Sequence, residues 1–513
     1  MNQPPSTSRR DLLRALGFGA GALAIGGPSI LTGCADDSAS SSSATTSTTT
    51  ASTAPPSTVA PTPFDPSKPY WVQGNFRGVT TEETVTELEV IGSIPPELSG
   101  LFVRNGSNAT TDDSLHWFLG DGMIHGVRIE SGKASWYRNR YVATPLREAG
   151  KDLLSFGGVP GKENNQSNVA VIHHAGKLLT TGEVGWPFQL DPTDLSTVGS
   201  WDFGGALGAT MTAHPKVDPV TGKMHFFGYE FLDPKVSIYS VAADGAMETS
   251  SVLAVDQATM MHDFAITDQD AIFWFGPVVF GTNPENLYPE VPFTWDPTGT
   301  SRVGIMPLGG TADQMRFVDI PQCFVFHGLN AHRDGDDIVV YVHRLEEAFG
   351  KRGDLVDAFL TEWRIDTAGP ELTFSEKRLY DRPLDLPTHD RRLTGRPSRH
   401  GWCATTTADD EHGFELLGVC HVDLQTGAED NWDPGANLRA GEGFFVPADP
   451  SADGATHEGE GWVLTYIWDR TTDRSSLGIF DALDVAKGPV AEVALPVRVP
   501  FGFHGYWVDD SVL

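Results

Sequence analysis

The sequence predicts an all-β fold, and a closed β-propeller of about seven blades is its natural candidate. Short segments of strand-type composition recur along the chain, and turn-forming residues separate them. The 55 glycines and 35 prolines are spread throughout, which favours many short strands over long helices. No second linker, charge block or transmembrane run interrupts residues 64–513, so we expect a single β domain there.

The individual strands and turns can be located from composition. Apolar, strand-type segments include KMHFFGY at residues 223–229, AIFWF at 271–275, DIVVYV at 337–342, GWVLTYIW at 461–468 and SLGIF at 476–480. Turn signals include DPVTG at 218–222 and ADG at 243–245. Seven blades would use roughly 64 residues each, a little more than four-stranded repeats need. The extra length is expected in loops and short helices that cap one face, where a pocket would lie.

The N-terminal 34 residues are predicted to be a twin-arginine-type lipoprotein signal. Arg9 and Arg10 precede a glycine-rich, mildly apolar run at residues 15–32, which is followed by the lipoprotein-type cysteine Cys34. Residues 35–63 are mostly Ser, Thr, Ala and Pro, which predicts a disordered tether. We expect an exported domain, lipid-anchored to the outer face of the bacterial cytoplasmic membrane, with a membrane-resident substrate. An uncleaved signal anchor, or a chance arginine pair in a cytoplasmic protein, is the alternative.

Charge and cysteine content exclude several function classes. A net charge of -32 and a pI near 4.7 argue against a nucleic-acid partner, because nothing offsets the repulsion by the phosphates. The domain holds Cys323, Cys403 and Cys420 with no CxxC spacing. We expect three buried thiols rather than a disulfide scaffold or a structural zinc site.

Four histidines stand in unusual settings that suggest a metal centre: His214, His262, His327 and His504. The first two intervals between them are each about one blade long and the third is close to three, which would bring the imidazoles to a common axis. Neutral imidazole is a good ligand for Fe(II), and four of them on an octahedral ion leave two positions open. A ligating histidine needs its other ring nitrogen held by an acceptor, and Glu183 and Glu442, both in apolar turns, are candidates. From the residues alone, either glutamate could equally cap a turn at the surface.

Seven longer motifs resemble those of the carotenoid cleavage oxygenases, which include carotenoid, apocarotenoid and stilbene dioxygenases. They are LFVRNGSN at 101–108, HWFLGDGMIHG at 116–126, AHPKVDPVTG at 213–222, MMHDFAIT at 260–267, FHGLNAH at 326–332, GEGFFVP at 441–447 and PFGFHGYW at 500–507. The resemblance covers the chain from about residue 64 to its end. It implies a seven-bladed propeller with Fe(2+) on its axis.

The resemblance also implies roles for individual residues. The four histidine ligands of the family fall on the histidines named above, and its glutamates behind the metal fall on Glu183 and Glu442. A third such glutamate is replaced here by Asp385, whose shorter side chain is expected to contact its histidine loosely or through water. Arg333 is a second departure, and both are expected near His327. The HWFLGDGMIHG stretch, with His116 and His125, is expected to be part of the propeller framework.

The implied activity is Fe(II)-dependent cleavage of a C=C bond of a carotenoid or apocarotenoid by O2, giving aldehyde or ketone products. The expected partners are O2, a hydrophobic polyene or aromatic alkene, and a membrane reached through the lipid anchor. No catalytic residue is expected beyond the metal centre. Cleavage of stilbene- or phenylpropene-type phenolics, isomerohydrolase activity, and a lipid-anchored carotenoid-binding protein with an inactive site are the alternatives.

Overall fold

A computed structural model describes residues 65, 67–110, 114, 116–151, 162–231, 233–280, 293–350, 355–409 and 413–513. The predicted export signal (1–34) and tether (35–63) lie outside the described residues. No helix in the described ranges is both long and apolar enough to cross a membrane. Helical structure there is confined to short segments: η1 (Tyr70–Val72), η2 (Trp117–Leu119), α2 (Pro145–Glu148), η3 (Ala312–Gln314), η4 (Arg391–Leu393) and η5 (Val485–Lys487).

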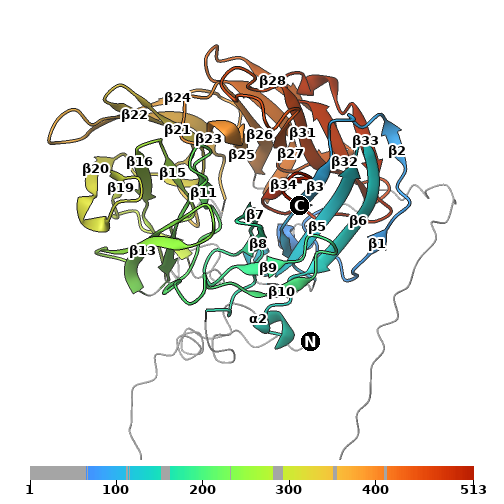
Figure 1. The fold of residues 1–513 in the computed structure, drawn as a ribbon, viewed down its shortest axis with the longest axis horizontal. Helices are drawn as coiled ribbons and strands as arrows, with labels where there is room; N and C mark the ends of the chain where they lie inside the picture. Colours follow the sequence, from blue (N-terminus) through green and yellow to red (C-terminus); the bar gives the residue numbers. More distant parts are fainter. Residues whose placement is uncertain are drawn as a thin grey trace, which may run out of the picture.

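Seven antiparallel sheets surround a central axis, which confirms the predicted seven-bladed propeller (Figure 1). Three blades are β7 (Ala170–His174) to β10 (Thr197–Ser200), with β8 (Lys177–Thr181) and β9 (Phe188–Leu190); β11 (Lys216–Val217), β12 (Met224–Glu230), β13 (Asp233–Val241) and β14 (Met247–Ala254); and β15 (Phe264–Ile266), β16 (Asp270–Phe275), β19 (Ser301–Pro307) and β20 (Arg316–Ile320). A separate hairpin of β17 (Val278–Phe280) and β18 (Phe293–Trp295) follows β16.

Two further blades are also built from consecutive strands. They are β21 (Phe324–Asp334), β22 (Asp337–Leu345), β23 (Phe359–Asp366) and β24 (Thr373–Arg378); and β25 (Leu384–His389), β26 (His400–Asp409), β27 (Gly413–Asp423) and β28 (Glu429–Trp432). In both four-stranded blades each strand pairs with the next one along the chain, as short connections between antiparallel strands allow.

The last two blades close the ring by combining strands from both ends of the domain. One contains β29 (Leu438–Ala440), β30 (Phe444–Pro447), β31 (Gly461–Asp469), β32 (Arg474–Asp481) and β33 (Ala491–Ala494), and its outermost strand is β2 (Val90–Gly92). The other contains β1 (Thr84–Val85), β3 (Gly100–Arg104), β4 (Ser107–Asn108), β5 (Asp121–Glu130) and β6 (Lys133–Tyr141), and it is completed by β34 (Gly505–Asp509). β34 pairs with β3 in register from Gly100 opposite Asp509 to Arg104 opposite Gly505. The blue and red strands therefore lie side by side in Figure 1.

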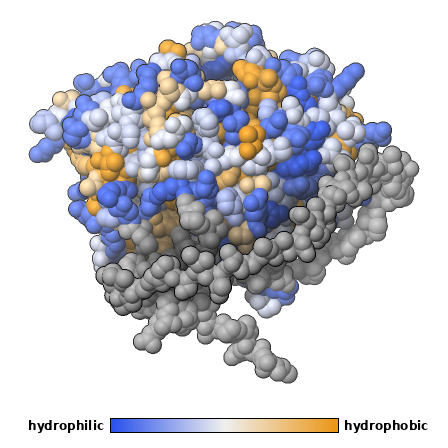
Figure 2. Space-filling model, turned by 60° about the horizontal axis from the view of Figure 1, so that its bottom comes forward, coloured by the Kyte–Doolittle hydropathy of each residue, from blue (hydrophilic) through white to orange (hydrophobic). Residues whose placement is uncertain are grey.

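The burial patterns explain how the blades pack. Nearly every residue of β12 is buried, whereas β14 alternates between exposed and half-buried residues, as expected for an outer strand with one solvated face. Neighbouring blades pack through apolar side chains; Trp402 of β26 and Phe445 of β30 stack with ring centroids 4.3 Å apart. The surface in Figure 2 is mainly polar, with apolar residues in small separate patches. Cys323, Cys403 and Cys420 are buried free thiols that form no disulfide, as predicted.

Candidate metal centre

The four histidines named from the sequence lie together on the axis side of the ring. His214 precedes β11, His262 precedes β15, His327 lies within β21, and His504 precedes β34. Each of these strands is at one end of the strand order of its sheet. The strands at the end of neighbouring sheets also contact one another, as β15 contacts β21 and β21 contacts β25. The arrangement of the blades therefore places one imidazole from each of four blades at a common point on the axis side.

The imidazole nitrogens of the four histidines converge. One ring nitrogen from each lies within 4.8 Å of those of the others. Nε2 of His214 is 3.0 Å from Nε2 of His262, and the rings of His214 and His504 have centroids 4.5 Å apart. Nε2 of His327 and Nε2 of His504 are buried and have no hydrogen-bond partner in the part of the chain that the structure describes. Such buried polar atoms are costly when unsatisfied, so the unpartnered nitrogens of His327 and His504, beside the convergent nitrogens of His214 and His262, fit a metal cation.

Three of the four imidazoles contact a buried or half-buried carboxylate through Nδ1. Nδ1 of His262 is 2.6 Å from Oε2 of Glu183, and Nδ1 of His504 is 2.8 Å from Oε1 of Glu442. A carboxylate accepts the Nδ1–H, so it holds the tautomer that leaves Nε2 free to bind a metal. These contacts resolve the two alternatives for Glu183 and Glu442: both lie behind the histidines rather than capping a surface turn.

Asp385 contacts His327 directly, so the predicted looser or water-bridged contact is wrong. Oδ1 of Asp385 lies 2.7 Å from Nδ1 of His327 and also accepts the backbone N–H of Leu386 at 2.8 Å. The backbone brings the shorter side chain into reach: the register of β25 is irregular between Asp385 and Thr388. Leu386 has a φ of 50°, in the left-handed region that a branched side chain rarely adopts. Strain of this kind persists only where surrounding contacts hold it.

Each of the three carboxylates is itself held by a second donor. The hydroxyl of Tyr229 donates to Oε1 of Glu183 at 2.5 Å, and the backbone N–H of Gly505 donates to Oε2 of Glu442 at 2.6 Å. Asp385 is held by the Leu386 N–H described above. The sequence interpretation missed Tyr229, because its partner lies 46 residues earlier in the chain.

The electrostatics of the cluster favour the neutral imidazole at His214 and His327. Burial lowers the pKa of His214 well below its usual range, and the neighbouring His504, His262 and His327 lower it further. Burial also lowers the pKa of His327, and the carboxylate of Asp385 opposes that shift only in part. For His262, burial lowers the pKa, but Glu183, Asp263 and Asp385 together raise it by more, so the net shift is upward. Only a deprotonated ring nitrogen can bind a metal, so His214 and His327 are held in the competent state.

Arg333 does not lie beside the imidazole of His327, so the expectation that this second departure lies near His327 is wrong. It stands six positions further along β21, roughly 20 Å at the rise of an extended strand. Its guanidinium makes two 2.7 Å contacts with the carboxylate of Asp270 and a 2.8 Å hydrogen bond to Thr367. Side chains on an extended strand separate quickly with sequence distance, and Arg333 therefore joins two blades away from the histidines.

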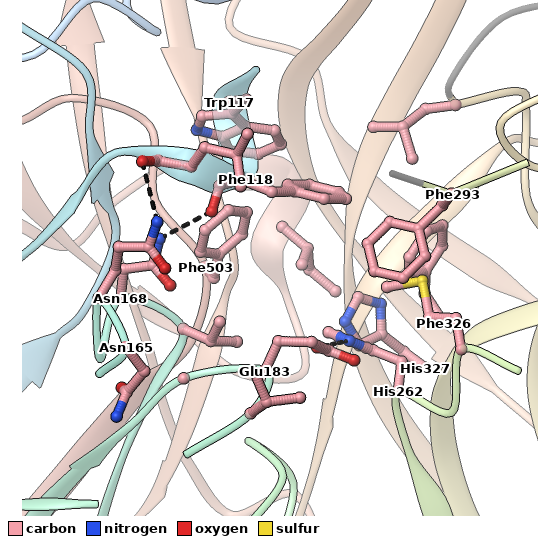
Figure 3. Close-up of a pocket in the computed structure, with 18 of the residues that line it drawn as sticks. Trp117, Phe118, Asn165, Asn168, Glu183, His262, Phe293, Phe326, His327 and Phe503 are labelled. Carbon is pink, nitrogen blue, oxygen red and sulfur yellow. Dashed lines mark hydrogen bonds and ion pairs between the residues drawn. The ribbon is translucent and has the colours of Figure 1, made fainter. Parts of the chain in front are cut away.

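An apolar cavity opens beside the histidines (Figure 3). His262 and His327 border it, and aromatic rings form much of its wall, with Phe118, Phe326 and Phe503 facing the open centre. The amides at its edge are already engaged; Gln166 and Asn168, for example, donate to backbone carbonyls of the segment 118–120. Among the described lining residues there is no Lys, Arg, Tyr, Ser or Thr.

The HWFLGDGMIHG stretch has a second role that the sequence interpretation missed. As predicted, its histidines are structural: Nδ1 of His116 accepts the backbone N–H of Phe118, and Nδ1 of His125 contacts the hydroxyl of Tyr137. However, Trp117, Phe118 and Leu119, which form η2, line the apolar cavity. Three large apolar residues in a row within a glycine-flanked irregular segment are a signal that could have indicated this.

A second, polar chamber lies against the same histidines. It is bordered by His214, His327 and His504, and by the charged or polar side chains of Lys216 and His389. Burial, with Lys216 and Arg391 nearby, lowers the pKa of His389 to about 3. His327 borders both cavities, so the four imidazoles stand between an apolar and a polar space.

Comparisons with known proteins agree with this architecture. Residues 76–509 match the family described as retinal pigment epithelial membrane protein. The chain is 32% identical over 502 residues to the carotenoid 9,10(9',10')-cleavage dioxygenase 1 of Pisum sativum, covering 88% of this chain and 92% of that one. It is 32% identical to the isoeugenol monooxygenase of Pseudomonas nitroreducens, covering 85% and 97%. The crystal structure of the lignostilbene dioxygenase of Pseudomonas brassicacearum superposes with a TM-score of 0.77 at 27% identity, covering 88% and 100%.

Proposed function

The chain belongs to the carotenoid cleavage oxygenase family, and from this premise we propose that it is an Fe(II)-dependent oxygenase that cleaves a C=C bond of a carotenoid or apocarotenoid. In the proposed reaction one alkene and one O2 give two carbonyl products, so each carbon of the double bond gains one oxygen atom. The observation that carries the proposal is the convergence of four buried imidazoles at the border of an apolar cavity.

In this proposal His214, His262, His327 and His504 hold the iron. Bound Fe(II) supplies the reactivity toward O2 that the alkene alone lacks. Glu183, Asp385 and Glu442 keep the Nδ1 proton of their histidines in place, so that Nε2 faces the metal. The aromatic wall of the cavity binds the conjugated chain by apolar contact and excludes water from the reacting bond.

The character of the cavity favours a polyene over a phenolic alkene. A phenol or phenolate buried in an apolar site needs a hydrogen-bond partner or a cation, since an unpaired polar group is costly there. The described lining offers no cationic side chain, and the Gln166 and Asn168 amides already bind backbone carbonyls. The indole N–H of Trp117 is buried without a partner among the described residues, but it could donate only one hydrogen bond and would not neutralise a phenolate. Stilbene or phenylpropene cleavage is the second candidate, because relatives with lignostilbene and isoeugenol in their names match over nearly the whole domain.

The test is turnover of a substrate panel by purified, iron-loaded protein. Carotenoids, apocarotenals and hydroxylated stilbenes are incubated in air and under argon, and aldehydes are quantified by liquid chromatography with mass spectrometry. We expect oxygen-dependent scission of a carotenoid or apocarotenal, and little product from stilbenes. Absence of stoichiometric iron after loading, or turnover by His262→Ala at the level of the unmodified protein, would overturn the proposal. Carotenoid binding without cleavage would indicate a binding protein instead.

We further propose that the domain is exported and anchored at the outer face of the bacterial cytoplasmic membrane through a lipid on Cys34. The sequence features of residues 1–34 and 35–63 support this, and they lie outside the described residues. A tether of such composition would let the domain reach a substrate dissolved in the membrane.

A further inference from the structure

Asp263 is a buried carboxylate that follows directly after His262. Its side chain is 1% exposed. Oδ1 of Asp263 lies 2.7 Å from the ammonium nitrogen of Lys216 and accepts the backbone N–H of Phe264 at 2.8 Å. Oδ2 accepts the backbone N–H of Gly328 at 2.9 Å. Both oxygens are therefore used, by donors from three separate parts of the chain.

Two of the three donors to Asp263, Lys216 and Gly328, come from the segments that carry His214 and His327. Lys216 is two residues after His214, at the start of β11, and Gly328 follows His327 in β21. The carboxylate thus joins three successive blades at the level of the metal centre. The fourth segment has an equivalent contact, because Glu442 accepts the backbone N–H of the residue after His504.

The backbone at Gly328 is tightly enclosed, which makes its N–H a rigid contact. A Cβ atom at this position would lie 3.0 Å from Cη2 of Trp274, closer than packed atoms normally approach. The register of β21 is irregular on both sides of Gly328, so the strand depends on contacts other than its own ladder there. An anchored N–H at Gly328 in turn fixes the direction in which the preceding residue, His327, projects.

The ammonium of Lys216 neutralises the buried carboxylate of Asp263, and this keeps the carboxylate in place. An isolated buried carboxylate is strongly disfavoured, and removing one partner of a buried pair leaves the other uncompensated. The side chain of Lys216 is 19% exposed, toward the polar chamber, so its ammonium keeps some solvent while it neutralises Asp263. Without the ammonium, the carboxylate would gain by turning toward water and would release Gly328.

We propose that Asp263, held by Lys216, is a positioning residue that keeps the segments of His214, His262 and His327 at the spacing that binds the metal. The inference rests on the proposed iron site and adds to it the pair that sets its geometry. Asp263 contacts none of the imidazole nitrogens that face the metal; it acts through the backbone and through Lys216.

The test measures Co(II) affinity and the visible absorption of the Co(II) protein, which reports the geometry of the ligands. The variants are D263N, K216M and the charge-conserving K216R, with D270N as a matched control. Asp270 is also buried and ion-paired, with Arg333 at 2.7 Å, and its carboxylate accepts from the hydroxyl of Thr267 rather than from a residue next to a histidine of the cluster. Circular dichroism and melting temperature establish that each variant is folded.

We expect D263N and K216M to weaken Co(II) binding by about 10–100-fold and to change the absorption spectrum, as loss of partners outside the ligand set does in other sites. K216R should bind more tightly than K216M, and D270N should lose stability but retain the affinity and spectrum of the unmodified protein. The amide of D263N would place a donor against the Lys216 ammonium or the Gly328 N–H, which is why it cannot substitute.

Unchanged affinity and spectrum in both D263N and K216M would overturn the inference while leaving the iron site intact. If D263N does not fold, the result for K216M tests the inference by itself. The side chain of Lys216 is partly solvated, so its replacement by methionine leaves no cavity in the core. Failure of the unmodified protein to bind Co(II) or Fe(II) would instead overturn the metal site itself, and the inference with it.

Discussion

Replacing Asp385 by asparagine should weaken iron binding, because this carboxylate holds the imidazole of His327. Oδ1 of Asp385 receives two N–H donors, from His327 and from the backbone of Leu386. Asparagine preserves the size of the side chain and removes its charge. Its amide either keeps a weaker neutral bond to His327 or turns a donor toward a donor.

The expected loss is about 10–100-fold in Fe(II) affinity, which corresponds to roughly 1.4–2.7 kcal/mol. Asp423→Asn is the matched control. Asp423 is also buried, and its carboxylate lies 2.6 Å from Arg399 rather than beside a histidine. The control should therefore lower stability without changing Fe(II) affinity.

The assay is an anaerobic Fe(II) titration in competition with a chromogenic chelator, followed by turnover at limiting and at excess iron. Asp385→Asn should lose activity at limiting iron and regain part of it at excess iron, because the ligand nitrogens are still present. An Fe(II) affinity equal to that of the unmodified protein would refute the reasoning, since it would mean that the carboxylate does not hold His327 for the metal.

Four further predictions follow from other parts of the molecule. Phe118→Leu should lower kcat/KM for a polyene substrate about tenfold through lost apolar contact, measured by product chromatography; equal values would argue against the apolar cavity as the substrate site. Trp402→Ala should lower the free energy of unfolding by about 3–5 kcal/mol in urea titrations, because it empties the contact between two blades, and a loss below about 1 kcal/mol would contradict that packing. A hydrogen bond from Arg399 holds the pKa of Asp423 well below its usual 3.8, so its stabilising contribution is complete above that pH and is lost on further acidification. The melting temperature of Asp423→Asn should consequently fall less steeply in acid, and parallel curves would count against this. Cys34→Ala should move the protein from the membrane fraction to the soluble fraction after cell lysis, and unchanged membrane association would exclude a lipid at this residue.

The strands were predictable because their signals are local. Residues 223–229, 271–275 and 461–468 were predicted from composition and lie within β12, β16 and β31, or differ by one residue at an end. Burial on both faces selects continuous apolar runs in such strands, and glycine-containing turns separate them. The closure of the ring was not predictable in this way, because β3 pairs with β34 across about four hundred residues of intervening chain and no local pattern encodes that partner.

In the candidate site, too, the features with local sequence signals were predictable, and the contacts between distant segments were not. The histidines and two glutamates were identified because each stands in a motif of its own, and the contacts of Glu183 and Glu442 agree with that identification. The direct reach of Asp385 depends on the irregular backbone around Leu386. The distance of Arg333 from the imidazoles depends on how far β21 runs from the axis.

The amino-acid sequence thus specified the strands, the turns and the chemistry of the metal ligands, because these depend on residue type and short-range pattern. It left open which side chains meet across blades: Tyr229 with Glu183, Asp263 with Lys216 and Gly328, and the aromatic wall that η2 shares with distant strands. Those contacts join residues that are far apart in the chain and close only when the sheets are packed around one axis. Their distances follow from blade geometry and packing, which no local stretch of sequence carries.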